Sequence, residues 1–172
     1  MRKMMRNSWT LGVALLVLTG AWAQAAKPDA QTEAEVKAAL EGYAKAYAAK
    51  DIKGVMDLIA PDAETAFTGC EGDESLLVGF DQVKTGHEHD FSQAQSIRTE
   101  CTPLVISAKG DVAWFSARLV LHWDTGTKKL LYAGRWTGVL EKRDGKWLFV
   151  QSHFSLPAEG QPEGQPAPAE KK

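Results

Sequence analysis

The residues best suited to chemistry lie near the C-terminal end of the chain, in the segment GRWTGVLEKRDGKWLFVQSHFS, residues 134–155. Arg135 and His153 stand near the two ends of this mostly apolar segment. A guanidinium can attract an anionic or carbonyl oxygen, and an imidazole can act as a base or orient a ligand. The Asp-Gly pair at 144–145 is typical of a tight turn between two strands. We therefore expect a β-hairpin that brings Arg135 close to His153.

The register of this hairpin decides which side chains share a face. A three-residue loop over 143–145, with Gly145 in a left-handed bulge position, places Arg135 opposite His153. Side chains alternate between the faces of a strand. One face is then expected to be apolar at one end and polar at the other, with Trp147, Phe149, Val139, Thr137, Gln151, Arg135, His153 and Ser155. The opposite face is expected to be apolar, with Trp136, Gly138, Leu140, Leu148, Val150 and Phe154.

Two interpretations of the polar-ended face stay open. In the first, it lines a concave pocket, because an Arg and a His are costly to bury unless they are paired or meet a ligand. The apolar face then packs on a second copy of the chain, which predicts a homodimer. In the second, Arg135 extends to solvent at the sheet edge, and His153 is a hydrogen-bonded core imidazole.

Helical periodicity precedes the strands. Residues 32–50, TEAEVKAALEGYAKAYAAK, carry apolar side chains at helical spacing, and this face ends in Tyr43 and Tyr47. Thr32 as N-cap with Glu35 three residues later resembles a capping box. Asp51 is a candidate N-cap for a short second helix. Residues 79–94 predict a third helix whose buried face carries Phe80, Val83, His87 and Phe91.

The remaining segments read as strands: a short one at 63–69 and four long ones at 96–108, 112–123, 129–142 and 146–155. Helices that come early and antiparallel strands that come late indicate an α+β fold. We expect a strongly curved antiparallel sheet wrapped around the long first helix.

The two ends of the chain differ in composition from its centre. Residues 1–25 have the basic start, the apolar run and the small-residue cleavage site of a signal peptide, which predicts a periplasmic or secreted protein; an uncleaved anchor is the alternative. Residues 28–156 form the expected domain. Residues 157–172 are rich in Pro, Gly, Glu and Gln, and predict a disordered tail.

Charge and cysteine content narrow the possible functions. The chain has a net charge of −2, which disfavours nucleic-acid binding. Cys70 and Cys101 can form one disulfide in an oxidising compartment, and two free buried thiols are the alternative. We predict no cofactor, because the chain has no glycine-rich phosphate loop. We predict no metal, because in HEHD (87–90) only His87 and Asp90 can share an ion, and two ligands do not make a site.

Several segments resemble the SnoaL-like group of the nuclear transport factor 2-like superfamily. They are YAAKDIKGVMDLIAPDAETAFTG, VGFDQVKTGHEHDF, GDVAWFSARLVL and, most specifically, the hairpin GRWTGVLEKRDGKWLFVQSHFS. The hairpin is also similar to the association domain of calcium/calmodulin-dependent kinase II. The resemblance implies a cone-shaped fold with a deep pocket between first helix and sheet, and dimerisation through the outer face of the sheet. It carries over Arg135, Thr137, His153 and Ser155 as recurring polar positions, and His87 departs from the usual apolar residue.

The sequence thus predicts an exported protein that binds a small organic ligand, with catalysis unassigned. The expected ligand-binding residues are Tyr43, Tyr47, His87, Arg135, Thr137, Trp147, Phe149, Gln151 and His153. A lyase or isomerase for a hydrophobic carbonyl compound is one alternative, with His153 as base and Tyr47 or Arg135 as oxyanion stabiliser. In an enolisation mechanism Tyr43 or Tyr47 would donate the hydrogen bond, but Asp57 and Asp90 are both open to a solvated role. A protein-association module is the other alternative.

Overall fold

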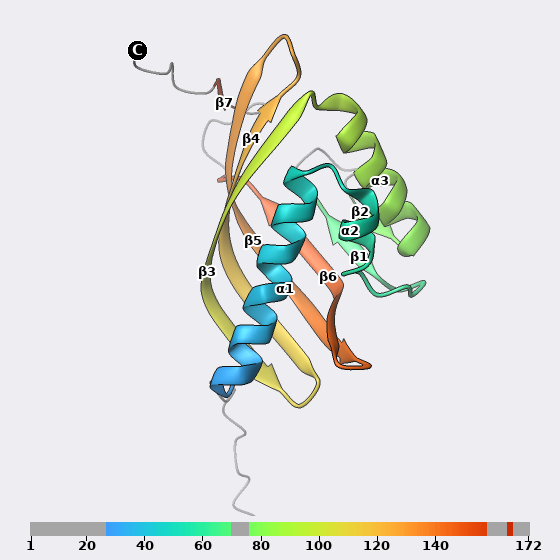
Figure 1. Cartoon of the computed structure of the whole chain (residues 1–172), viewed down its shortest axis with the longest axis vertical. Helices are drawn as coiled ribbons and strands as arrows, with labels where there is room; N and C mark the ends of the chain where they lie inside the picture. Colours follow the sequence, from blue (N-terminus) through green and yellow to red (C-terminus); the bar gives the residue numbers. More distant parts are fainter. Residues whose placement is uncertain (1–26, 70–75, 158–164, 167–172) are drawn as a thin grey trace, which may run out of the picture.

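The computed structural model describes residues 27–69, 76–157 and 165–166. This part of the chain forms three helices, α1 (Ala30–Ala48), α2 (Ile52–Met56) and α3 (Phe80–Gln93), and one seven-stranded sheet. The strands are β1 (Ala66–Thr68), β2 (Leu76–Val78), β3 (Ser96–Lys109), β4 (Val112–Asp124), β5 (Lys129–Arg143), β6 (Lys146–Ser155) and β7 (Gln165–Pro166). Their order is β2-β1-β6-β5-β4-β3, with β7 beside β5. Figure 1 shows α1 lying across the concave face of the curved sheet. The predicted α+β fold is confirmed.

Helix α1 begins earlier than its capping pattern indicated. Asp29 is the N-cap, and its carboxylate accepts hydrogen bonds from the backbone N–H and the hydroxyl of Thr32, each at 2.9 Å. The prediction of Thr32 as N-cap is therefore wrong, because a better acceptor stands three residues before it. Glu35 accepts hydrogen bonds from Nζ of Lys142 (2.6 Å) and Nε1 of Trp147 (3.0 Å). It thereby ties α1 to β5 and β6, and the hydrogen bonds from Lys142, Gln31 and Trp147 together lower the Glu35 pKa to about 2.

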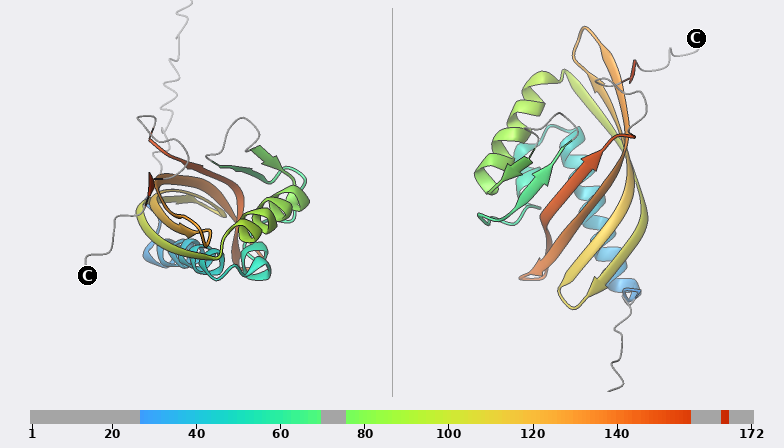
Figure 2. Two further views of the ribbon diagram at one scale, coloured as in Figure 1. Left: turned by 90° about the horizontal axis from the view of Figure 1, so that it is seen from above. Right: turned by 180° about the vertical axis from the view of Figure 1, so that it is seen from behind.

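The hydrophobic core lies between α1 and the concave face of the sheet. Val36 and Leu40 of α1 and Leu140 and Phe149 of the sheet are completely buried. Phe149 packs against several aromatic rings, of which Trp136 is stacked at a centroid distance of 5.6 Å. Figure 2 shows how the sheet curves around the first helix. This packing fills the space between sheet and α1 at the end near Glu35, and α3 lies at the opposite end of the sheet (Figure 1).

The hairpin of β5 and β6 has a different register from the predicted one. Its loop has two residues, Asp144 and Gly145, both with positive φ (50° and 79°), so Arg143 pairs with Lys146. Such a turn matches the twist of the strands better than a three-residue loop does. A bulge then shifts the pairing between Val139 and Leu140. Arg135 consequently pairs with Ser155 rather than with His153.

The two shifts act differently along the hairpin. Because together they move the partners by two residues, the polar side chains Arg135, Thr137, Gln151, His153 and Ser155 still share one face, together with Val139. The bulge places Trp147 and Phe149 on the opposite face, with Leu140 and Trp136. This apolar face packs inward, and Arg135, Gln151 and His153 are exposed on the outer face. The homodimer was inferred from an apolar outer face, and the prediction of that face is wrong. The homodimer itself stays a prediction.

The second and third helices follow their predicted patterns. Asp51 caps α2 by accepting a hydrogen bond from the backbone N–H of Gly54. Val83, His87 and Phe91 are buried along one face of α3, as expected. Gly86 lies where α3 passes over β2, and a Cβ at this position would collide with the side chain of Leu77. Strand β2, which the sequence analysis missed, thus lies directly beneath α3.

Some predictions fall wholly or partly outside the described residues. They include the signal peptide at 1–25 and Cys70, so export and the disulfide stay predictions; Cys101 is half-buried on β3. Within the predicted disordered tail, Gln165 and Pro166 form β7 by pairing with Leu131 and Leu130 of β5. Strand β5 extends beyond its partner β6 and leaves an edge for these two residues. The disordered tail stays a prediction. No helix in the described ranges is long and apolar enough to span a membrane.

Candidate functional site

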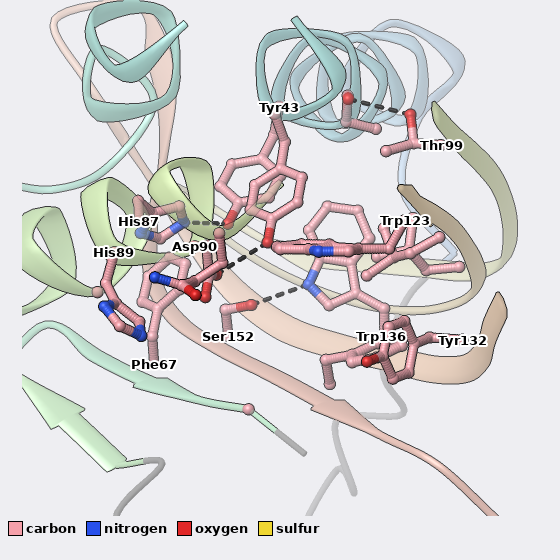
Figure 3. A pocket seen from close by; sticks show the side chains of 18 of the residues that line it. Tyr43, Phe67, His87, His89, Asp90, Thr99, Trp123, Tyr132, Trp136 and Ser152 are labelled. Atoms are coloured by element: carbon pink, nitrogen blue, oxygen red, sulfur yellow. Dashed lines mark hydrogen bonds between the residues drawn. The ribbon is translucent and has the colours of Figure 1, made fainter. Parts of the chain in front are cut away.

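A cavity of about 710 Å³ opens between α1, α3 and the concave face of the sheet. We call it the helix–sheet cavity. Its polar lining comes largely from the helices, with Tyr43 and Tyr47 on α1 and His87 and Asp90 on α3. Figure 3 shows Tyr43, His87 and Asp90 on one side of the cavity and Trp123, Tyr132 and Trp136 on the other. The volume lies within the usual range for small-molecule sites, roughly 300–1,000 Å³.

Two hydrogen bonds join α1 to α3 across the cavity wall. The hydroxyl of Tyr43 meets Nε2 of His87 at 2.6 Å, and the hydroxyl of Tyr47 donates to Oδ2 of Asp90 at 2.8 Å. The tyrosines are four residues apart and the partners three residues apart, which are the spacings that place side chains on one face of a helix. The two helices therefore present matched pairs, one turn above the other.

The hydrogen bonds of His87 and its burial together define its protonation state. Its Nδ1 lies 2.7 Å from the carbonyl oxygen of Val83, which can only accept, so Nδ1 carries the proton. Nε2 then accepts the hydroxyl proton of Tyr43. Burial lowers the pKa of His87, because the charged imidazolium loses its solvation. His87 is thus a neutral imidazole whose two nitrogens are both occupied.

Asp90 has the environment of an acid–base group. It is half-buried, and burial raises the pKa of its carboxyl group against the lowering effects of the Tyr47 hydroxyl and the nearby histidines. Oδ2 is held by Tyr47, whereas Oδ1 has no hydrogen-bond partner among the described residues. A carboxyl group of raised pKa in a largely apolar cavity is a recurrent feature of functional sites.

The sheet supplies most of the apolar wall. Apolar and aromatic side chains from five strands line the cavity: Phe67, Leu77, Leu119, Leu121, Trp123, Leu130, Tyr132, Trp136 and Phe154. The strands also contribute the hydroxyl groups of Thr68, Thr99 and Ser152, and the Ser152 hydroxyl accepts a hydrogen bond from Nε1 of Trp136 at 2.8 Å. Strand β3 is held to the first helix by Thr99, whose hydroxyl donates to the carbonyl oxygen of Ala44.

Three of the predicted site residues meet in the cavity. Tyr43, Tyr47 and His87 all line it. Trp147 and Phe149 do not; they are buried in the core nearer the β5–β6 turn. These two were expected to form the pocket wall, and the bulge beyond Phe149 is the reason that they share a face with core residues instead.

The remaining predicted residues lie on the outer face of the sheet, away from the cavity. They are Arg135, Thr137, Gln151 and His153. The Arg135 guanidinium donates to the carbonyl oxygen of Leu156 at 3.1 Å, and across the strand it faces another exposed arginine, Arg118. The expectation that Arg135 and His153 share a pocket is wrong, because the curved sheet turns its apolar face, not its polar one, toward α1.

The sequence analysis left the role of Asp90 open. The spacing could have indicated Asp90 as a site residue, since it stands three residues after His87 on a predicted helix. The two residues were considered together only as metal ligands. In the described ranges, no group of three or more His, Cys, Asp or Glu residues is arranged to hold a metal ion. Asp57, the other carboxylate considered, is exposed and pairs with Lys53 on the surface.

Comparisons with known proteins agree with this architecture. The family model of the SnoaL-like domain matches residues 36–159 of the chain. No curated protein matches the chain.

Solved structures similar to the chain share its fold. A nuclear transport factor 2-like protein of unknown function from Shewanella oneidensis is 16% identical, with 72% of this chain and 98% of that chain covered and a TM-score of 0.61. A putative aromatic ring hydroxylase from Novosphingobium aromaticivorans is 18% identical, with 73% and 89% covered and a TM-score of 0.66. A putative calcium/calmodulin-dependent protein kinase II association domain from Xanthomonas campestris is 26% identical, with 73% and 88% covered and a TM-score of 0.61.

Proposed function

The chain belongs to the SnoaL-like domain family, and we propose that it binds a small organic ligand in the helix–sheet cavity. The observation that carries this proposal is the cavity itself: about 710 Å³, lined by aromatic and aliphatic side chains around a few fixed polar groups. Small-molecule sites combine these features, because the apolar wall supplies affinity and the polar groups supply orientation. Tyr43, Tyr47 and Asp90 would orient the ligand, with His87 holding Tyr43 in place, and Leu121, Trp123 and Trp136 would contact its apolar body.

A fluorescent, uncharged aromatic probe, N-phenylnaphthylamine, tests this proposal. We expect saturable binding at one site per chain. Leu121→Trp, which fills the cavity from β4, is expected to weaken binding by about tenfold or more, equivalent to about 1.4 kcal/mol. The measurement is a fluorescence titration of the folded wild type and variant.

The matched controls are Arg135→Ala and His153→Ala on the outer face, which are expected to leave probe affinity unchanged. Loss of binding in these controls, or equal binding by Leu121→Trp, would place the probe elsewhere and contradict the proposal.

A second candidate function is proton transfer on the bound ligand, as in a lyase or isomerase. The observation that favours it is Asp90, whose carboxyl group lines the cavity with a raised pKa and one free oxygen among the described contacts. Asp90 then takes the role of base first assigned to His153. Once a ligand that is turned over is known, Asp90→Asn is expected to lower kcat by about a hundredfold or more with ligand affinity largely retained. Full turnover by this variant would leave binding alone as the function.

A further inference from the structure

The charges around the helix–sheet cavity discriminate between classes of ligand. None of the described residues that line it is a Lys or an Arg. Its ionisable side chains, apart from the tyrosines, are His87, His89 and Asp90. His87 is held neutral, with Nδ1 donating to the Val83 carbonyl oxygen and Nε2 accepting from Tyr43. His89 is exposed at the rim. Asp90 is therefore the dominant charge within the cavity.

Asp90 is positioned to meet a ligand. Tyr47 holds Oδ2 at 2.8 Å and fixes the carboxylate, while Oδ1 has no partner among the described residues. The carboxylate lies between the imidazole of His87 and the open interior of the cavity (Figure 3). A buried carboxylate is costly in an apolar cavity unless an opposite charge or a hydrogen-bond donor meets it. A cationic ligand group would supply both.

The opposite wall of the cavity is also suited to a positive charge. Trp123, Tyr132 and Trp136 line the sheet side, opposite Asp90 (Figure 3). The face of an aromatic ring attracts a cation through its quadrupole. Trp136 is almost completely buried and stacks on Phe149, so Trp123 and Tyr132 are the rings that a ligand cation would meet. An anion would instead lose its solvation, meet no guanidinium or ammonium group among the described lining residues, and lie near the Asp90 carboxylate.

We propose that the helix–sheet cavity selects an organic cation, an amine or quaternary ammonium group attached to an apolar or aromatic body, with Asp90 as the counter-charge. This inference rests on the proposed function, since it names the ligand class of the same cavity. The sequence had suggested an anionic or carbonyl oxygen as the partner of Arg135. The cavity favours a cation instead, because the Arg135 guanidinium faces solvent on the other side of the sheet.

Three naphthalene compounds of similar shape test the inference: naphthylmethylamine, a cation at neutral pH, naphthylmethanol, which is neutral, and naphthoate, an anion. Their affinities are measured by displacement of N-phenylnaphthylamine and by calorimetry. For the wild type we expect the cation to bind about tenfold or more tightly than the alcohol, and the anion to bind least. Asp90→Asn is expected to remove the advantage of the cation, so that its affinity falls to about that of the alcohol in the same variant.

The matched control is Asp81→Asn, which removes one exposed carboxylate from the same helix and is expected to keep the preference for the cation. Asp90→Glu, which retains the charge, is expected to preserve part of it. An anion that binds the wild type as tightly as the cation, or a cation affinity that is equal in Asp90→Asn and Asp81→Asn, would overturn the inference. Should Asp90→Asn not fold, the order of the three affinities in the wild type still decides.

The result also separates this inference from the proposed function. Binding of the alcohol and the probe with no preference for the cation would refute the ligand class and leave the binding site standing. Failure of all three compounds and of N-phenylnaphthylamine to bind would refute both.

Discussion

Replacing Phe149 by Ala is expected to lower the free energy of unfolding by about 3–5 kcal/mol, the range for deletion of a buried aromatic ring. Phe149 is completely buried. Its ring stacks on Trp136 with an interplanar angle of 18° and lies 5.1 Å from the ring of Tyr43, measured between centroids. The truncation would leave a void between α1 and the sheet that rigid neighbouring rings cannot fill. The effect belongs to the core, since Phe149 does not line the cavity.

Urea unfolding followed by tryptophan fluorescence measures this loss. Phe154→Ala is the matched control, because Phe154 is only partly buried and borders the cavity rather than the core centre. We expect it to cost distinctly less than Phe149→Ala. Equal losses for the two variants would mean that Phe149 is not the centre of the core.

Acidification from about pH 7.5 to about pH 5 is expected to lower the free energy of unfolding through His87. Its pKa is lowered by burial in the folded protein, whereas in the unfolded chain it is about 6.5. Below the pKa of His87 in the unfolded chain, the unfolded chain binds a proton that the folded protein does not bind. The free energy of unfolding therefore decreases as the pH decreases. The slope for one proton cannot exceed about 1.4 kcal/mol per pH unit.

Other groups that face His87 modify this dependence. Tyr43 contacts it from α1 and is expected to stay protonated, since burial raises its pKa; Phe67 of β1 and Phe91 of α3 add apolar contact. Asp90 acts in the opposite direction. Its pKa is raised in the folded state, so its cost to stability is present at neutral pH and is relieved as pH falls and the folded carboxyl group takes up its proton.

The variant Asp90→Asn separates the two effects. It removes the titration of Asp90, which opposes that of His87, and it removes the negative charge beside His87. The free energy of unfolding should therefore decrease more steeply on acidification than in the wild type. At neutral pH the same variant is expected to be more stable than the wild type, because a half-buried charge is lost. Urea unfolding at a series of pH values measures both effects, with Asp81→Asn at an exposed position of α3 as control. A stability that is flat or rising toward pH 5 in Asp90→Asn would contradict the assignment to His87.

The elements of the fold could be predicted from the sequence because their periodicity is strong. The spacing of Val36, Leu40, Tyr43 and Tyr47 located α1, and that of Val83, His87 and Phe91 located α3. Their boundaries depended on single hydrogen bonds, as Asp29 demonstrates by capping α1 in place of Thr32. Strand β2 has only three residues, too few for an alternating pattern to be recognised.

The candidate site was harder to predict because it depends on which face of the hairpin turns inward. A two-residue turn and a bulge each change the register by one residue, and neither can be read from alternation alone. The polar residues Arg135 and His153 were assigned to the pocket, although burial of the apolar face with Trp136 and Leu140 is energetically simpler. Asp90 was identified only as a residue with an open role, since its partner Tyr47 lies 43 positions away.

Helices and strands contribute different parts of the cavity lining, and this affects how the ligand specificity proposed for the cavity can change. The acid–base groups reside on α1 and α3, whereas the strands determine the width and outline of the space. Substitutions at strand positions such as Leu119 or Leu121 can therefore reshape the outline while both tyrosine-anchored pairs persist. Under the proposed function, ligand shape and ligand chemistry are therefore encoded in separate stretches of the chain, so each can diversify independently of the other.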